Sequence, residues 1–196
     1  MIEFALAVFF LIITPGPGVL SLAGIGSAYG YRTGLAYLTG LFFGHNLVAL
    51  LVISGIAASA LAIPWLRTVL AWASVGYLLY LAAKIAFAGS KVAFVEATRE
   101  PGLRDGVALQ AINPKAYAVS TALFSGFAFM PDAPGTETIV KIVIMNMIWI
   151  TLHLAWLWVG VTLRRLDLPA RTQRTINIGM ALSMLMVVGL AIYAQA

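Results

Sequence analysis

Two proline-containing breaks interrupt apolar segments of this chain, about a hundred residues apart. The first break, TPGPG at 14–18, separates the apolar runs 4–13 and 19–28. The second, INPK at 112–115, interrupts the apolar stretch 106–129. Inside a bilayer, irregular backbone is tolerated only where protein or a polar cavity satisfies its hydrogen-bonding groups. Paired breaks in corresponding halves of a membrane chain are typical of a transporter's binding site.

Composition places these breaks in a membrane. The chain is 62% hydrophobic and 10% charged, whereas soluble domains carry ~25% charged residues. Long apolar runs with few charges predict membrane spans. We expect an all-α polytopic membrane protein with six transmembrane helices, at about 4–28, 35–62, 65–88, 106–129, 139–163 and 176–195. No Lys or Arg precedes the first run, unlike a signal peptide, so we interpret it as a retained span.

The connections between spans set the expected orientation. A tight hairpin is expected at 63–64, between the second and third spans. Nine basic residues fall in the loops on one side of the membrane, two on the other, and Lys115 lies within a span. By the positive-inside rule, both termini are expected in the periplasm of a bacterial inner (plasma) membrane. The basic excess is expected to contact membrane lipid, with no nucleic acid implied.

One polar linker, 89–105, divides the chain into three spans and three spans. We expect a single transporter domain over 1–196, with repeat one at about 1–88 and repeat two at about 106–196. An odd number of spans per repeat makes the repeats inverted, with helices one and four broken. Landmarks at a similar offset support this: Asn46 corresponds to Asn146, and Pro15 to Pro114.

Each break is expected to start a new half-helix near the membrane midplane. Asn113 should cap the helix that Pro114 begins, and Thr14 could cap in the same way before Pro15. The unpaired amides and the dipole of a helix start favour a substrate carboxylate. Lys115 could bind that carboxylate, because a lysine buried in a bilayer costs ~3 kcal/mol and needs a role or a partner. The alternatives are packing kinks and a lysine that extends to the cytoplasmic face.

The candidate ligands combine the breaks with the matched asparagines. The substrate-binding candidates are Thr14, Pro15, Gly16, Pro17, Gly18, Asn46, Asn113, Pro114, Lys115 and Asn146. The proton-coupling candidates are His45 and His153, which titrate near neutral pH, and Asp105 at the inner mouth of the fourth span. The histidines can equally be hydrogen-bonded interior residues. No catalytic residues, metal ligands or cofactors are expected, and the absence of cysteine excludes thiolate sites and disulfides.

Small and aromatic residues carry weaker signals. Glycines recur at four-residue spacing at Gly26, Gly30 and Gly34, and again at Gly40 and Gly44. This pattern predicts close helix packing, either within the chain or in a dimer. The tryptophans, Trp149 among them, are interpreted as interface anchors or core.

Several motifs together resemble the lysine exporter (LysE/RhtB) family. They are TPGPG at 14–18, GYRTG at 30–34, GYLLYL at 76–81 and LRDGVALQAINPKA at 103–116. The resemblance covers nearly the whole chain and implies a six-span inner-membrane exporter of amino acids or their derivatives. It also implies export driven by a proton or other ion gradient, and a homodimer as a possible assembly. Many members have asparagine where this chain has Gly18, and a different element follows the second break, so the substrate stays open.

We therefore expect a secondary active exporter of amino acids or their derivatives. An inorganic cation exporter of the same fold is the alternative, but it would need carboxylate or thiolate ligands within the spans. An intramembrane serine protease would need a serine nucleophile in a glycine-rich motif with a histidine partner. The serines in the spans lack that setting, so an enzyme is not expected.

Overall fold

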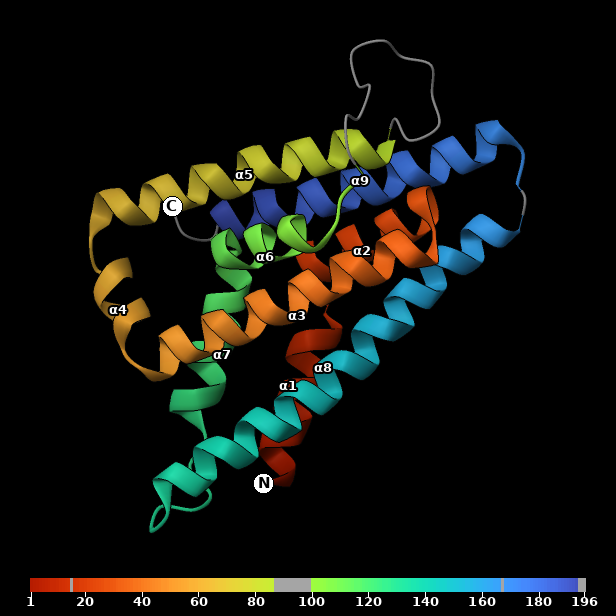
Figure 1. Cartoon of the computed structure of the whole chain (residues 1–196). Coiled ribbons are helices and arrows are strands. Elements are labelled where there is room, and N and C mark those ends of the chain that lie inside the picture. Colours follow the sequence, from red (N-terminus) through yellow and green to blue (C-terminus); the bar gives the residue numbers. More distant parts are fainter. Residues whose placement is uncertain (15, 87–99, 167, 194–196) are drawn as a thin grey trace.

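The computed structural model describes residues 1–14, 16–86, 100–166 and 168–193, and these residues form helices and connecting turns with no β-strand. The expected all-helical fold is confirmed for this part of the chain (Figure 1). Pro15, most of the predicted linker 89–105 and the end of the sixth predicted span lie outside the described residues. The helices are α1 (Ile2–Ile13), α2 (Pro17–Tyr29), α3 (Tyr31–Ile53), α4 (Ile56–Leu61), α5 (Pro64–Ala86), α6 (Leu103–Ile112), α7 (Pro114–Gly126), α8 (Pro134–Arg165) and α9 (Ala170–Tyr193).

Length and composition identify candidate membrane spans among the described residues. α3, α8 and the stretch Pro64–Ala83 of α5 are long and apolar enough to cross a bilayer. α1 and α2 together form a fourth candidate, with a bend of 52° between them. These spans make the chain a multi-pass membrane protein. The count of six spans and their inverted repeat stay predictions.

The second predicted span, 35–62, is wrong at its C-terminal end. α3 ends at Ile53, and Gly55 adopts a left-handed conformation with φ of 76° before the short helix α4. Glycine adopts positive φ without steric cost, so the chain turns here. The tight hairpin expected at 63–64 is therefore a longer connection that contains α4. The apolar composition of 56–62 concealed this turn.

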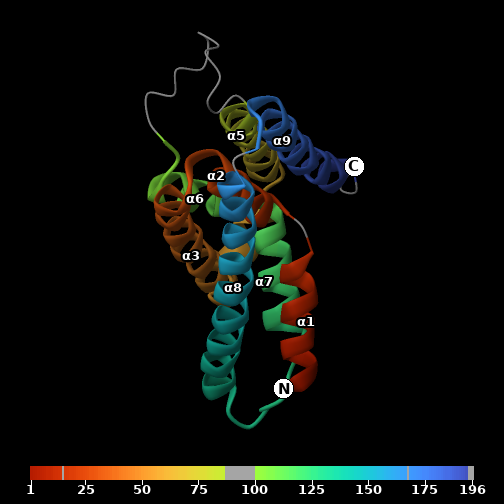
Figure 2. The ribbon, with the colours of Figure 1, turned by 90° about the vertical axis from the view of Figure 1, so that its right-hand side faces the viewer.

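Helix packing joins the two halves of the sequence. α3 packs against α6 and α7, α2 and α1 pack against α8, and α5 packs against α9 (Figures 1 and 2). A Cβ atom at Gly40 would collide with the carbonyl of Leu103 in α6, and one at Gly160 with the carbonyl of Ala23 in α2. Gly34 likewise faces Leu157 of α8. The glycine spacing therefore serves close packing inside the chain.

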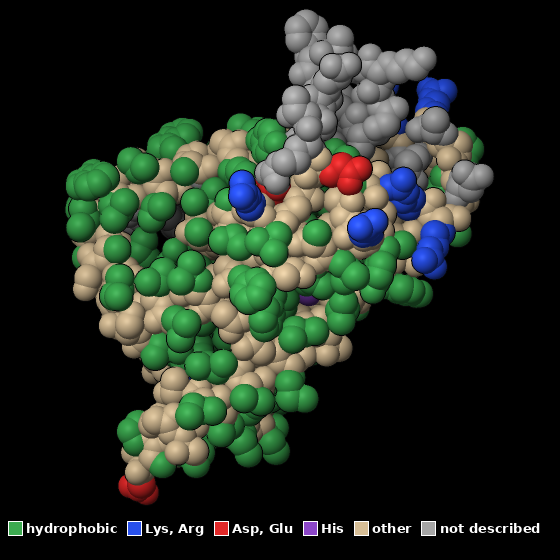
Figure 3. Space-filling view, viewed as in Figure 1, with side chains coloured by type: hydrophobic (Ala, Val, Ile, Leu, Met, Phe, Trp, Pro, Cys, Tyr) green, Lys and Arg blue, Asp and Glu red, His purple; other side chains and the backbone are tan. Residues whose placement is uncertain are grey.

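The surface separates apolar flanks from a basic end. Large apolar side chains such as Leu50, Trp72 and Trp158 are exposed along the helices. Hydrophobic side chains cover much of the face in Figure 3. A surface of this kind suits lipid acyl chains. On that face the Lys and Arg side chains gather at one end. The exposed arginines lie at the starts of α3, α6 and α9 and at the end of α8: Arg32, Arg104, Arg164, Arg165, Arg171 and Arg174.

Candidate functional site

At the first junction, between α1 and α2, the backbone amides that begin α2 have no side-chain cap. α2 begins at Pro17, with Gly16 as its N-cap. The expectation that Thr14 caps this helix is wrong, because its hydroxyl donates to the Phe10 carbonyl of α1 at 2.7 Å. A threonine near the end of a helix readily bonds the carbonyl four residues earlier, which explains the difference. No side chain caps α2, so its first amides remain available.

The second junction, between α6 and α7, is capped as predicted. Asn113 Oδ1 accepts a hydrogen bond from the Lys115 amide at 3.1 Å, and Pro114 takes the first position of α7. Asn113 Nδ2 donates to Gln110 Oε1 at 3.0 Å, and both side chains are buried. Both polar atoms of the Asn113 side chain are therefore hydrogen-bonded, which fixes the orientation of the side chain.

Lys115 connects the two junctions. Its ammonium donates to the Thr14 carbonyl at 2.5 Å. Its aliphatic chain lies across Gly16, where an added Cβ atom would come within 2.8 Å of Lys115 Cδ. A side chain at position 16 would therefore displace the end of the lysine. The two sequence breaks, a hundred residues apart, thus meet through one charged side chain.

A cavity of about 50 Å³ lies at this meeting point. That volume holds a few water molecules, or a small ligand once these leave. The lining residues come from α1, α2, α3, α6, α7, α8 and the two junctions: Leu11, Ile12, Thr14, Gly16, Gly18, Val19, His45, Gln110, Asn113, Lys115, Ala116, Val119, Trp149 and His153. Five of the predicted substrate-binding residues and both predicted histidines are therefore brought to one cavity.

Three stacked rings form one wall of the cavity. The indole of Trp149 lies between two imidazoles, with ring centroids 5.2 Å from His45 and 3.6 Å from His153, at interplanar angles of 13° and 15°. His153 Nδ1 lies 2.9 Å from the Trp149 carbonyl and must donate to it, because a carbonyl only accepts. Nε2 of the neutral His153 ring is then an acceptor. His45 Nε2 is buried and has no hydrogen-bond partner among the described residues.

The other predicted ligands lie away from the cavity. Asn46 and Asn146 bind each other, with amide-to-oxygen distances of 3.0 and 2.8 Å, and so join α3 to α8. The Asn46 amide also donates to the Phe42 carbonyl at 2.9 Å. Neither asparagine lines the cavity. The two asparagines that the sequence placed at equivalent positions of the two halves therefore contact each other directly. Their role as substrate ligands stays a prediction.

Asp105 stabilises the start of α6. Its carboxylate accepts from the Gly102 amide at 2.8 Å, and Tyr77 donates to the Asp105 carbonyl at 2.9 Å. A carboxylate in the first turn of a helix is favourable because it pairs with free amides there. Asp105 does not line the cavity, so its proposed part in proton coupling has no contact with the histidines to support it.

Sequence reasoning missed two polar or aromatic residues of the cavity. Gln110 precedes Asn113 by three residues, and Trp149 precedes His153 by four. Residues at these spacings share one face of a helix. A glutamine in an apolar segment, one turn before a predicted cap, was the available signal. For Trp149 the signal was its spacing to His153.

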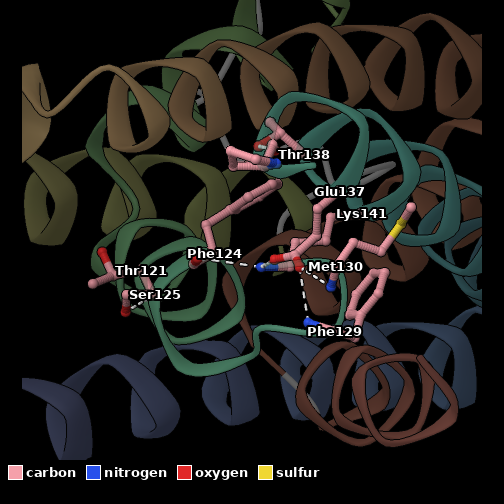
Figure 4. A network of polar contacts seen from close by, with 9 residues as sticks. Thr121, Phe124, Ser125, Phe129, Met130, Glu137, Thr138 and Lys141 are labelled. Atoms are coloured by element: carbon pink, nitrogen blue, oxygen red, sulfur yellow. Dashed lines mark hydrogen bonds and ion pairs between the residues drawn. The ribbon is translucent and has the colours of Figure 1, made fainter. Parts of the chain in front are cut away.

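A second buried polar group was also missed, at the start of α8 (Figure 4). α8 begins at Pro134, five residues before the expected span, so Glu137 and Lys141 both lie inside it. They form an ion pair at 2.7 Å, with 7% and 3% of their surfaces exposed. Glu137 also accepts the amides of Phe129 (2.8 Å) and Met130. Lys141 is one of the two basic residues predicted on the outer side of the membrane, and instead it is enclosed.

Aromatic rings surround this pair. The Lys141 ammonium lies 5.9 Å from the ring centroid of Phe4 and 5.7 Å from that of Phe129. The Phe4 ring contacts Phe127 and Phe129, each with centroids 5.9 Å apart. Lys141 also reaches the Phe124 carbonyl at 3.5 Å. The Glu137–Lys141 pair therefore holds α1, the end of α7 and the following loop against α8.

The sequence has relatives among bacterial efflux proteins. It is 28% identical to a leucine efflux protein of Klebsiella pneumoniae subsp. pneumoniae, over 60% of this chain and 58% of that protein. Another leucine efflux protein, from an Enterobacter species, is 27% identical over 69% of this chain and 65% of its own length. The chain thus covers less than two thirds of these two relatives. A cysteine/O-acetylserine efflux protein of Escherichia coli O1:K1 is 28% identical over 87% of this chain and 86% of that protein.

A comparison with solved structures gives no match. The family comparison covers almost the whole sequence, since the LysE type translocator family matches residues 9–195. That range includes both helix junctions, the stacked rings and the Glu137–Lys141 pair. The chain therefore belongs to the LysE type translocator family.

Proposed function

We propose that this protein is a secondary active exporter of amino acids or their derivatives in the bacterial inner membrane. It acts as a transporter and not as an enzyme. The observation that carries the proposal is the cavity where the two junctions meet, which is lined by Lys115 and by His45, whose Nε2 has no partner among the described residues. The efflux relatives and the family match support amino-acid substrates.

A zwitterionic amino acid fits the polarity of this cavity. Its carboxylate would accept hydrogen bonds from the Lys115 ammonium and from the free amides at the start of α2, where the helix dipole is positive. Its ammonium group would donate to the Thr14 carbonyl, which Lys115 now occupies. Substrate binding would therefore exchange one partner of Lys115 for another. Pro15 and Gly16 would act as the hinge of this rearrangement.

We further propose a single transporter domain of six spans in two inverted repeats, with both termini in the periplasm. The packing supports this, because α3 of the first half lies on α6 and α7 while α8 of the second half lies on α1 and α2. The Asn46–Asn146 contact lies between corresponding positions of the two halves. Rocking of one repeat against the other would expose the cavity alternately.

Proton coupling is proposed for the stacked histidines. His45 and His153 line the same cavity as the proposed substrate ligands, so their protonation would act directly on substrate binding. Asp105 is the more distant candidate. A homodimer is compatible with the exposed apolar flanks, which lipid can equally cover.

Export from preloaded proteoliposomes tests the proposed function. The wild-type protein should release at least one amino acid from a panel of the twenty, faster with an imposed pH gradient than without it. Asn113→Ala should lower the rate, because Lys115 and Gln110 lose the side chain that orients them. The matched control is Ser125→Ala, an exposed polar position on the same helix that bonds only the Thr121 carbonyl.

Two outcomes contradict the proposal in different ways. If the wild-type protein releases no amino acid or derivative, the function is wrong. If it does, and Asn113→Ala exports as fast as Ser125→Ala, the function stands and the site is wrongly placed.

A further inference from the structure

Gly18 leaves a gap in the cavity wall that packing does not require. An added Cβ atom there would lie 3.7 Å from His153 Nε2 and 3.8 Å from Gln110 Nε2, which are ordinary van der Waals distances. The same atom at Gly26 or Gly34 would meet Leu157 at 3.0 Å or closer. Glycine is also a poor residue for a helical turn. Neither backbone approach nor helix formation therefore explains glycine at position 18.

Two polar atoms flank this gap. His153 Nε2 is an acceptor, because Nδ1 donates to the Trp149 carbonyl. Gln110 Nε2 is a donor, because Oε1 of the same side chain accepts from Asn113. Their hydrogen bonds to other described residues use His153 Nδ1 and Gln110 Oε1, so both Nε2 atoms are left open to the cavity that these residues line. Polar groups inside a protein are normally paired, so a donor and an acceptor that both lie next to the space at Gly18 are available to a ligand.

From this arrangement we infer that Gly18, His153 and Gln110 form a specificity pocket, the Gly18 notch, for a small uncharged side chain that both donates and accepts hydrogen bonds. The inference rests on the proposed amino-acid export and names the side-chain class within it. A hydroxyl group satisfies both atoms, since it donates to His153 Nε2 and accepts from Gln110 Nε2.

Other side-chain classes fit the notch less well. A carboxylate has no proton for His153 Nε2, and an ammonium group has no lone pair for the Gln110 amide. An apolar side chain leaves both atoms desolvated and unpaired, and sites built to bond a polar group reject such analogues strongly. The cavity volume of about 50 Å³ further disfavours bulky side chains.

The notch and the charged end of the cavity are within reach of one small molecule. Lys115 lies across Gly16, and the notch opens at Gly18, two residues further along the chain. Two residues span at most about 7 Å. A small amino acid can therefore place its carboxylate at Lys115 and its side chain in the notch.

Competition between isosteric amino acids tests the inference. Purified protein in proteoliposomes is assayed for export of L-serine and L-alanine, which differ by one hydroxyl group, and of L-threonine and L-valine. The wild-type protein should prefer serine to alanine by about tenfold, the effect of a pair of hydrogen bonds in a buried site. Gly18→Ala fills the notch with a methyl group. The serine preference should then fall to about one.

Gly76→Ala is the control. It makes the same substitution at an exposed position of α5, where an added Cβ atom meets nothing within 4 Å, and it should keep the serine preference. If Gly18→Ala does not fold, Gln110→Met removes the donor at similar length and should reduce the preference in the same way. The serine-induced rise in melting temperature gives a readout that does not depend on transport.

The failures are distinguishable. Absence of any amino-acid export by the wild-type protein refutes the proposed function. Export without a serine preference in the wild type overturns the Gly18 notch and leaves the exporter intact. An equal loss of serine and alanine export in Gly18→Ala and Gln110→Met also overturns it, because a generally damaged site is not a selective one.

Discussion

The cavity and the Glu137–Lys141 pair are both polar regions buried in an apolar molecule, yet they differ in how their hydrogen bonds are completed. At the pair, Glu137 accepts from Lys141 and from two backbone amides, and Lys141 packs between aromatic rings. In the cavity, His45 Nε2 is buried without a partner among the described residues, and the Nε2 atoms of His153 and Gln110 lie next to the space at Gly18. A completed network holds helices together, whereas an incomplete one is ready to bind a ligand.

Their places in the fold reinforce this contrast. The pair lies in the first two turns of α8 and ties the loop after α7 to the start of α1 (Figure 4). The cavity lies at the two helix junctions, where α1 and α2 meet at a bend of 52°. At a junction some backbone amides and carbonyls are free, whereas in the middle of a regular helix they bond each other. We therefore expect substitutions in the cavity to affect export, and substitutions at the pair to affect stability.

Removing the cavity charge should have the largest effect. Lys115→Met should reduce export by about 100-fold, because a hydrogen bond to a charged group contributes up to ~3 kcal/mol. The melting temperature should stay close to that of the wild type, since the Lys115 ammonium bonds a single backbone carbonyl among the described residues. Rates in proteoliposomes and thermal unfolding measure the two quantities. Arg32→Met, which removes an exposed charge at the start of α3, controls for net charge. A large drop in melting temperature would instead show that Lys115 stabilises the fold, as the Glu137–Lys141 pair is expected to do.

Disrupting the Glu137–Lys141 pair should produce the opposite pattern. Glu137→Gln or Lys141→Met alone leaves an uncompensated buried charge, and each should lower the melting temperature by about 5 °C or more. Export per folded molecule should stay within about twofold of the wild-type rate, because removing one member of a structural pair leaves the cavity ligands in place.

The double variant Glu137→Gln, Lys141→Met sharpens this test. It carries no charge, and the glutamine oxygen still accepts the amides of Phe129 and Met130. It should therefore regain most of the lost stability. Thermal unfolding of all four proteins gives the coupling between the two residues. If the losses simply add, the two charges do not depend on each other and the proposed pair is incorrect.

Replacing the stacked histidines should have a selective effect. His45→Gln and His153→Gln together should abolish the acceleration of export by a pH gradient, while exchange of amino acid across the membrane continues. The comparison uses identical proteoliposomes with and without the gradient. Should the double variant keep the wild-type response to the gradient, protons are coupled elsewhere, and Asp105→Asn becomes the next variant to assay.

The smallest effect is expected at the asparagine contact. Asn46→Ala should lower the melting temperature by about 2–4 °C, the value of one or two hydrogen bonds in a chain of this size. Asn146→Ala added to it should cost little more, since the partner is already lost. Export should be nearly unchanged because neither side chain lines the cavity. A tenfold loss of export from either variant would restore both residues to the substrate site.

Local sequence signals located the two junctions well. Proline at Pro17 and Pro114 marks the starts of α2 and α7, and Asn113 caps α7 as its position predicts. These features depend on the backbone chemistry of a few neighbouring residues. Thr14 failed because a threonine near a helix end has two backbone partners to choose from, and the sequence does not say which one it bonds.

Signals spread along a segment were less reliable. Hydropathy extended the second span through Gly55, although a single left-handed residue ends α3 there. It also began the fifth span at 139 and so separated Glu137 from Lys141, because isolated charges lower the local mean without revealing their pairing four residues apart. Hydropathy averages over a window, so it cannot resolve a one-residue turn or an ion pair inside a helix.

The sequence by itself determined the class of this protein: an all-helical membrane chain with two helix starts, the first near its N-terminus and the second just past its middle. Those properties follow from composition and from the chemistry of proline, asparagine and glycine over a few residues. Only the tertiary structure decided that Lys115 reaches Thr14, that Trp149 stacks between two histidines, and that Gly18 opens a gap between His153 and Gln110. Each of these contacts joins residues more than ninety positions apart, or depends on one that does. Their geometry arises from helix packing, which the local pattern of the chain does not encode.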